Sequence, residues 1–597
     1  MFIEVRMRPK HKKMGHKTMR HKVMALAMCA GVSGFGLEFG SMGQVSAGMG
    51  GAGVAVRDSA WGLYYNPALL GADRRTKMGY SFGIQFKEQN LLQLATIDVA
   101  NLEKLPDTLT NQLTGPSSGG TSVEIGGQKV DGALGGMLNA LVPNPQKPGE
   151  IQAGDISNVI QGLGGQACND FKACAGEIAN NPDLANKFKD KLQEAATEGG
   201  SPLVGSIIGG IDADKLGDVI DKISQGGGDI GSEILEVAGK ITIAKGADSV
   251  MDKLLNDFGV VDGALKGNDV NLATQNGFVF QFAGDKGSRR VESDTLGTIN
   301  IQEIDSGRGA VGIGLFASAF SNASAQIDPN NNKLIFDLGG KYYQASINGN
   351  SVTLEYLQNQ QDKLNGSIMN DKAQHSLYAN ALALVEIPIG YGHTIFTPMG
   401  DVNLGLAVKF IQGIGYGDKI NFAVGNMPSV SVDKNKMDMA QTFGLDFGML
   451  YSPRFVKNLH LGLVAKNVNS PTINRTGVAD TTLHPQVRAG VSYEMMDFLT
   501  FAFDADVLPN ETLSLSSPKS QFFGGGVMAN FKKVDFRLGA MQDIRSNAGE
   551  GLILTGGLNL FGFLDVAMQY GLGQNITIQG INVSNYMSLR VGGQFSF

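Results

Sequence analysis

The chain has 597 residues, of which 42% are apolar and only 18% are charged, and its formal net charge is −7. A net negative charge gives no reason to expect nucleic acid as a partner. No apolar run approaches the ~20 residues of a transmembrane helix, so helical membrane spanning is not expected. Glycine accounts for 82 residues, about twice the usual share, which suits crowded strands, tight turns and loops.

The first 35 residues predict a secretory signal peptide. A basic region precedes the short apolar stretch 23–32, and small residues follow it. Met19 is an alternative initiator, because a start there leaves a compact signal. Cys29 is a weak candidate for lipid attachment, since methionine replaces the small residue that usually precedes such a cysteine. We expect no metal and no cofactor.

Residues 36–76 form an N-terminal segment with too many glycines for a long strand. We interpret the aromatic residues of this segment as a plug or gate, and the alternative is simple anchoring of the segment. The first clear strand, 77–87, follows within a first barrel-strand region, 77–99. The candidate gate residues that follow from this aromatic pattern are Trp61, Tyr64 and Tyr65.

Residues 100–276 predict a large α-helical insertion, which we interpret as a small cap domain. Short amphipathic helices are expected at 155–163, 182–196, 212–224 and 231–239, because apolar residues recur at helical spacing between glycine-rich breaks. The candidate N-caps of these helices are Asp155, Asp212 and Asp229.

Two cysteines, Cys168 and Cys174, remain once the leader is removed. An even pair in an exported protein indicates a local disulfide, and the alternative is two unpaired thiols. Their spacing is not Cys-x-x-Cys, so a redox-active role is not expected.

Residues 277–597 are the predicted remainder of an all-β transmembrane barrel with about fourteen antiparallel strands. Apolar and polar residues alternate with the period of two that strands require. Residues 332–357 indicate hairpins with a turn at Asn348-Gly349, which we interpret as ornaments of a long loop. The predicted strands are 77–87, 277–283, 308–321, 375–389, 402–415, 440–451, 458–466, 485–494, 498–507, 521–531, 533–542, 551–560, 562–571 and 586–597.

Alternation alone does not separate a soluble sandwich from a membrane barrel. Counted back from the C-terminus, the predicted connections alternate between long and short, as in outer-membrane barrels with short periplasmic turns and long external loops. The last strand carries Phe595 and ends at Phe597, which fit a C-terminal signal for the barrel-assembly machinery. We therefore predict a location in outer-membrane lipid, with the insertion extracellular.

The inward positions of the predicted strands carry the charges. A charge facing lipid at the bilayer midplane costs roughly 2–4 kcal/mol, whereas a charge in the lumen can pair or hydrate. We interpret these charges as a structural network, with a substrate path as the alternative. Asp504 and Asp506 could form an acid/base pair, but a lumen pair is the simpler interpretation. The inward charges are Lys409, Asp446, Lys466, Arg488, Asp504, Asp506, Arg537, Asp565 and Arg590.

Nothing in the sequence predicts an enzyme. Neither G-x-S-x-G nor H-E-x-x-H occurs, and no cysteine accompanies a histidine at the spacing of metal ligands. We therefore assign no catalytic residue.

Two regions resemble a known family. The sequence from Gly50 to Ala55, together with Tyr64-Tyr65-Asn66-Pro67-Ala68, resembles the N-terminal segment of FadL-type outer-membrane transporters. Residues 461–471, 484–491 and 504–512 look like the related group known as TraF-type conjugal-transfer proteins. The resemblance covers about 36–87 and 375–597. It implies a fourteen-stranded barrel, a hatch in its lumen that includes Asn66 and Pro67, and passage of hydrophobic molecules.

Three functions fit these patterns. The first is a FadL- or TraF-type barrel that admits hydrophobic small molecules across the outer membrane. The second is a structural outer-membrane component of a conjugal-transfer or secretion apparatus, with other envelope proteins as its partners. The third is a soluble adhesive β-protein secreted past the outer membrane, and the terminal Phe597 argues against it.

Overall fold

The computed structural model describes most of the chain. The expected signal peptide and Cys29 lie outside the described residues, as does most of the helix expected at 231–239. The described residues are 38–73, 75–94, 122–199, 201–225, 234, 237, 239–244, 249–282, 288–289, 304–305, 309–338, 341–348, 351–357, 366–368, 370, 372–422, 437–473, 481–531, 534–546, 549–578 and 581–597.

Fourteen antiparallel strands close into a barrel, which confirms the predicted fold. Each strand pairs with its neighbour along the chain, and the first strand closes the ring by pairing with the last, Lys77 opposite Ser596. The barrel strands are β1 (Lys77–Gln89), β6 (Asp269–Phe282), β9 (Ala310–Gln326), β13 (His375–Thr397), β14 (Gly400–Phe422), β15 (Met437–Pro453), β16 (Leu459–Lys466), β19 (Gln486–Met496), β20 (Leu499–Asp506), β23 (Phe522–Asn530), β24 (Val534–Asp543), β25 (Ile553–Leu560), β26 (Leu564–Gly571) and β29 (Tyr586–Ser596).

Every barrel strand turns large apolar side chains outward. Examples are Phe82 on β1, Phe443 on β15 and Leu538 on β24, all strongly exposed. A continuous apolar exterior is stable only in lipid, so the barrel lies in the outer membrane. None of the helices in the described ranges is long and apolar enough to cross a membrane.

The two ends of the barrel differ. At one end, the turn end, most connections are tight, such as 397–400 and 560–564, and both Lys77 and Ser596 lie there. At the other end, the loop end, the connections are longer. One connection at the turn end is an exception: residues 283–309 join β6 to β9 and contain the short strands β7 (Ser288–Arg289) and β8 (Ile304–Asp305).

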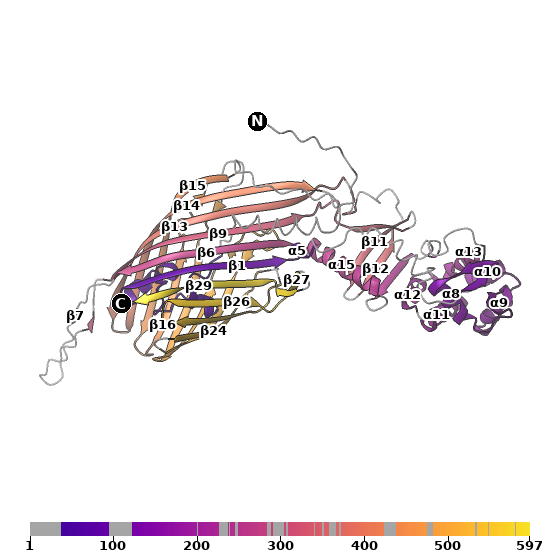
Figure 1. The fold of residues 1–597 in the computed structure, drawn as a ribbon, viewed down its shortest axis with the longest axis horizontal. Helices are drawn as coiled ribbons and strands as arrows, with labels where there is room; N and C mark the ends of the chain where they lie inside the picture. The colour runs from indigo at the N-terminus through magenta and orange to yellow at the C-terminus, as the bar shows by residue number, and fades with distance from the viewer. Residues whose placement is uncertain are drawn as a thin grey trace, which may run out of the picture.

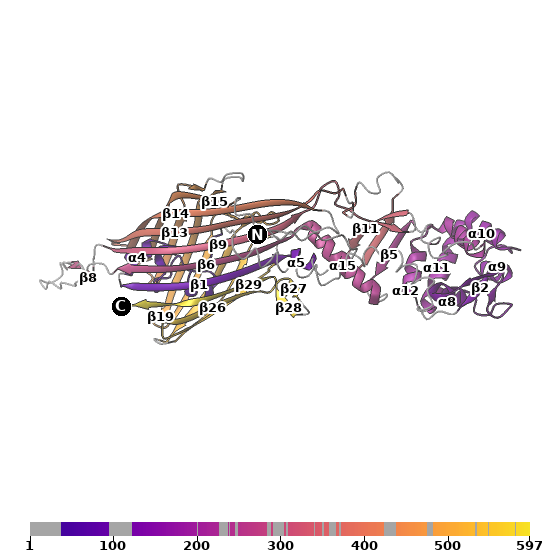
Figure 2. The same ribbon diagram turned by 45° about the horizontal axis from the view of Figure 1, so that its top comes forward.

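The barrel wall is much taller on one side (Figure 2). Strands β13 and β14 each have 23 residues, whereas β16 and β20 each have eight. About 9–11 residues suffice for a tilted membrane strand. The taller strands therefore extend on the order of 40 Å beyond what the bilayer needs, toward the second part of the molecule.

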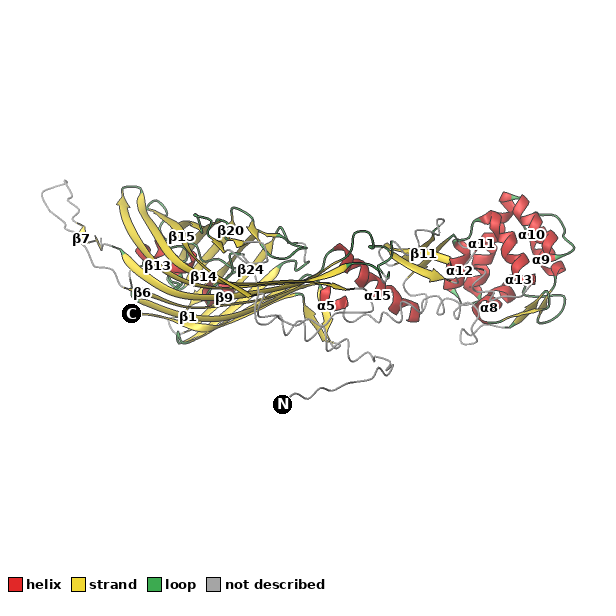
Figure 3. Ribbon diagram, turned by 90° about the horizontal axis from the view of Figure 1, so that it is seen from above, coloured by secondary structure: helices red, strands yellow, loops and turns green. Residues whose placement is uncertain are grey.

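That second part, the cap, comprises residues 122–266 and 334–356 and lies beyond the loop end (Figures 1 and 3). Its outer portion is mainly helical, and a four-stranded sheet with a long helix lies between this portion and the barrel. The elements of the cap are β2 (Val123–Ile125), β3 (Gln128–Val130), α8 (Gly132–Leu141), β4 (Glu150–Ile151), α9 (Ala153–Gly162), α10 (Phe171–Asn180), α11 (Pro182–Glu198), α12 (Pro202–Gly209), η3 (Ala213–Lys215), α13 (Leu216–Gln225), β5 (Lys240–Ala244), α15 (Ser249–Lys266), β10 (Leu334–Leu338), β11 (Lys341–Asn348) and β12 (Ser351–Tyr356).

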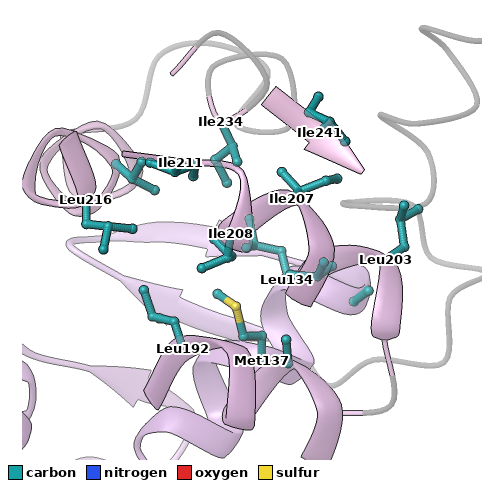
Figure 4. Packing of buried hydrophobic residues seen from close by; sticks show 14 of the residues in the cluster. Leu134, Met137, Leu192, Leu203, Ile207, Ile208, Ile211, Leu216, Ile234 and Ile241 are labelled. Atoms are coloured by element: carbon teal, nitrogen blue, oxygen red, sulfur yellow. The ribbon is translucent and has the colours of Figure 1, made fainter. Parts of the chain in front are cut away.

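One apolar core joins the helical portion and the sheet of the cap (Figure 4). Leu192 of α11, Ile208 of α12 and Ile241 of β5 all belong to it. Phe258 of α15 stacks edge-on against Phe336 of β10, with ring centroids 5.0 Å apart. The cap is therefore a single folded unit assembled from two separate stretches of the chain.

Several predicted details of the cap are wrong. The hairpins at 332–357 are not loop ornaments, because β12 pairs with β5 and β10 and β11 complete the same sheet. The insertion also ends before residue 276, since β6 begins at Asp269. Asp155 is not an N-cap: it is the third residue of α9, and its carboxylate accepts the Gln152 N–H at 2.8 Å. The predicted disulfide bond between Cys168 and Cys174, by contrast, is confirmed.

Candidate functional site in the barrel lumen

Residues 38–73, the hatch, fill the lumen of the barrel. They fold into three short helices, α2 (Gln44–Gly48), α3 (Gly62–Tyr65) and α4 (Ala68–Ala72), joined by bends. Helix α2 contacts β25 and β26, and α4 contacts β13 and β14 on the opposite wall. The hatch thus bridges the full width of the barrel.

Asn66 and Pro67 shape the centre of the hatch. The Asn66 side-chain amide donates to the Val54 carbonyl oxygen at 2.9 Å and to the Met449 carbonyl oxygen of β15 at 3.0 Å. Its own side-chain oxygen accepts the Ala68 N–H at 3.1 Å, next to Pro67, which precedes α4. One buried amide therefore ties two parts of the hatch to each other and to the wall.

The other candidate gate residues form an aromatic cluster between hatch and wall. The Tyr64 ring lies 5.0 Å from the Tyr65 ring and 5.4 Å from Phe316 of β9, and Trp61 lies 6.2 Å from Phe316. Tyr65 accepts the Met42 N–H at 2.7 Å. Trp61 and Tyr65 are fully buried, so these two side chains pack inside the barrel and are not in contact with solvent.

Two cations of the wall face these aromatic rings. The Lys466 ammonium lies 3.6 Å from the centre of the Tyr64 ring, and the Arg488 guanidinium lies 4.1 Å from the centre of Phe39. Cation–π contacts in a desolvated setting contribute about 2 kcal/mol or more. They fasten the aromatic cluster to β16 and β19.

Asp504 and Asp506 have separate partners. The Asp504 carboxylate accepts the backbone N–H groups of Gly53 and Val54 of the hatch, at 2.8 and 2.9 Å. Asp506 pairs with Arg488 at 2.6 Å. The first carboxylate holds the hatch and the second holds a cation, so the geometry corresponds to a lumen network and not to an acid/base pair.

The remaining predicted inward charges form three further groups in the wall, and all nine are buried. The Lys409 ammonium pairs with Glu386 at 3.0 Å and with Asp446 at 3.1 Å. Arg537 pairs with Asp565 at 2.6 Å. Arg590 donates to the Gln275 side chain at 2.7 Å.

Inward glycines of the strands make room for the hatch, a feature that the sequence analysis missed. A Cβ atom on Gly405 would lie 2.1 Å from the Pro67 carbonyl carbon, and one on Gly448 would lie 2.0 Å from the Asn66 side-chain oxygen. Similar contacts occur where Gly524 meets Gly50 and where Gly592 meets Gln44. These glycines occupy the inward positions of the period-two pattern, which is the signal that could have identified them.

Two small cavities lie between the hatch and the loop end. They share Glu38, Gly40 and Gln85 in their linings, and each has room for about two water molecules. Loop residues cover this region: Ile473, Leu483 and Leu513 pack into an apolar cluster with Phe320, Leu382 and Ile411 of the tall wall. We call these loop residues the lid.

The structure is thus an outer-membrane barrel of fourteen strands with its own N-terminal segment folded into the lumen. The description "F plasmid transfer operon, TraF, protein" names the family whose model matches residues 181–506, and the chain belongs to this family. The match includes much of the cap, which the sequence resemblance at 36–87 and 375–597 had left out.

Solved structures show only remote similarity. The toluene transporter TbuX of Ralstonia pickettii is 11% identical, covering 94% of this chain and 100% of its own, with a TM-score of 0.33. A Pseudomonas aeruginosa FadL homologue is 7% identical, covering 95% of this chain and 98% of its own, with the same TM-score of 0.33. A Rhodopseudomonas blastica porin variant is 13% identical and covers 55% of this chain and 92% of its own, with a TM-score of 0.21. No curated protein matches the chain.

Proposed function

We propose that this protein admits hydrophobic small molecules across the outer membrane, and that movement of the hatch gates their passage. The single observation that carries the proposal is a lumen filled by a segment that continues into β1 and is otherwise held to the wall by noncovalent contacts. A purely structural barrel needs no removable filling, whereas a gated pathway does.

The contacts of the hatch suit a segment that is seated firmly and can still move. Besides the Asp504 carboxylate and the cation–π contacts, its attachments include hydrogen bonds spread around the barrel, such as Thr555 to Gly48, Ser492 to Ala55 and Thr394 to Gly71. Each such bond contributes only about 0.5–1.5 kcal/mol net. With the loop end placed outside the cell, as short periplasmic turns imply, a solute meets the lid first and the hatch second.

Deletion of residues 40–72 tests the gate. We expect the deleted protein to form the same barrel, shown by heat-modifiable gel mobility, and to conduct ions in planar bilayers far better than the full chain. Unchanged conductance in a folded barrel would contradict the proposal. Faster uptake of a hydrophobic dye by cells that produce the full chain, compared with cells that lack it, would support passage directly.

A second candidate function is a structural platform in a conjugal-transfer or secretion apparatus. The observation that favours this function is the cap, which is a folded unit with its own apolar core and a disulfide bond. The long strands of the barrel hold it beyond the loop end, where another protein could bind it. Affinity purification of the full chain, compared with a variant that lacks both stretches of the cap, 122–266 and 334–356, distinguishes the two. Envelope proteins captured only by the full chain, with no change in dye uptake, would favour the platform.

A further inference from the structure

Near the loop end, the inward side chains of four neighbouring strands change from polar to apolar. Gln85 of β1 lies opposite Ala273 of β6, which lies opposite Phe320 of β9, which lies opposite Leu382 of β13. One row of inward side chains thus runs from polar to apolar. Phe320 lines a small cavity together with Gln85 and also belongs to the apolar cluster beneath the lid.

The polar end of this row is rich in carboxylates. Glu38 lines both cavities, and its side chain forms no hydrogen bond or ion pair with the described residues. Charges on Lys87, Asp543, Glu550 and Asp506 all act on it. Lys87 is already paired with Glu550 at 2.9 Å.

The charge balance at this end is negative. Five carboxylates (Glu38, Asp269, Asp506, Asp543 and Glu550) gather around three cations, Lys87, Arg488 and Arg590. Lys87 and Arg488 are each paired with a carboxylate, and Arg590 donates to the Gln275 side chain. One oxygen of the buried Asp543 has no hydrogen-bond partner among the described residues. A further anion here would be repelled, whereas a cation or a hydrogen-bond donor would be stabilised.

The loop that carries the lid residue Leu513 is hydrogen-bonded to one of these carboxylates, Asp269. The hydroxyl groups of Ser514 and Ser516 both donate to Asp269, and Leu513 beside them packs into the apolar cluster. A ligand with an apolar chain and a donor head could therefore replace both attachments of this loop at once, the chain in place of Leu513 and the head in place of the serine hydroxyls.

We propose that the loop end of the lumen binds an amphiphile with a neutral or cationic head group and discriminates against a carboxylate head. The chain lies against Phe320 and Leu382, and the head lies near Glu38 and Asp269. This inference rests on the proposed passage of hydrophobic molecules and names the class of molecule that the site selects.

Three ligands of equal chain length test the selection: decylamine, decan-1-ol and decanoate. Each is titrated calorimetrically into the full chain in lipid nanodiscs at neutral pH, with empty nanodiscs as the blank. We expect saturable binding of the amine and the alcohol, with decanoate about tenfold weaker or more. Equal or tighter binding of decanoate would overturn the inference while leaving hydrophobic passage intact.

Two alanine-to-tryptophan variants locate the site. Ala273→Trp fills the inward row and should abolish saturable binding, whereas Ala319→Trp, on the outward face of the paired strand β9, should leave it unchanged. Binding unaffected by Ala273→Trp in a folded barrel would contradict the assignment, as would a wild-type protein that binds none of the three ligands. Failure of the proposed function would be detected by a different experiment: a folded barrel without residues 40–72 would show no increase in conductance.

Discussion

The barrel and the cap bury opposite kinds of side chain. In the cap, Phe188 and Leu192 of α11 are buried in a core formed by other apolar residues. In the barrel, Arg537 is 1% exposed while its neighbour Leu538 is 68% exposed. Apolar side chains therefore face inward in the cap, which is surrounded by water, and outward in the barrel, which is surrounded by lipid. Because one chain contains both arrangements, substitutions of the same kind should have opposite effects on the stability of the cap and of the barrel.

Removal of a large apolar side chain should be costly only in the cap. We expect Phe188→Ala to destabilise the cap by about 3–5 kcal/mol, because Phe188 is fully buried. The matched change Phe443→Ala on the lipid face of β15 should leave barrel stability nearly unaltered. Limited proteolysis of the cap and heat-modifiable mobility of the barrel measure the two effects, and equal losses would contradict the comparison.

Introduction of a charge should be costly on the barrel exterior. Leu538→Arg places a cation in lipid and should reduce barrel stability by roughly 2–4 kcal/mol if the residue lies near the midplane. Lys191, exposed on α11, provides the control, since Lys191→Arg changes nothing in water. A tolerated Leu538→Arg, measured by urea unfolding in lipid vesicles, would place that face away from the membrane core.

The disulfide should matter to the cap alone. Its closed loop is short, with a sequence separation of six residues, so the loss of chain entropy in the unfolded state stabilises the cap by about 2 kcal/mol. The double variant Cys168→Ser/Cys174→Ser should lower the melting temperature of the cap by several degrees and leave the mobility of the barrel unchanged. A shift in the barrel transition would show that the two parts unfold together.

The hatch, unlike the cap and the barrel wall, should respond to pH through Glu38. Burial, with further contributions from Asp543 and Glu550, raises the pKa of Glu38 from 4.5 to about 7, against the opposing effect of Lys87. A raised acid pKa stabilises the docked state below about 4.5, and this contribution is lost as the pH rises through about 7. Conductance should therefore increase toward alkaline pH, and Glu38→Gln should remove that dependence. A pH profile unchanged by the substitution would contradict this role for Glu38.

The strands of the barrel could be predicted because each carries its own signal. Alternation within 8–11 residues identified even short strands such as β16 and β26, and the same alternation placed Lys409 and Arg590 inward. The pairing of β12 with β5 could not be found in this way, because more than a hundred residues separate the partners and the local pattern of each fits many hairpins. The helices α8 and α12 were missed because they are apolar or glycine-rich on all sides, which leaves no helical period to detect.

The lumen was only partly predictable for a related reason. The inward charges follow from the period of a strand, but their partners depend on how the hatch folds. Asp504 receives two hatch N–H groups and Asp506 receives Arg488, although both side chains stand on the same face of β20. No pattern within β20 distinguishes them.

The account depends most on the docking of the hatch against inward glycines of the wall, and a single change in the wall tests it. Gly405→Val places side-chain atoms where Pro67 lies, whereas Gly556→Val meets no atom closer than 3.8 Å. Planar-bilayer conductance of the two variants should differ: the account predicts an open pore for Gly405→Val and a closed barrel, like the wild type, for Gly556→Val. A folded Gly405→Val barrel that stays closed would contradict the claim that this docking seals the lumen.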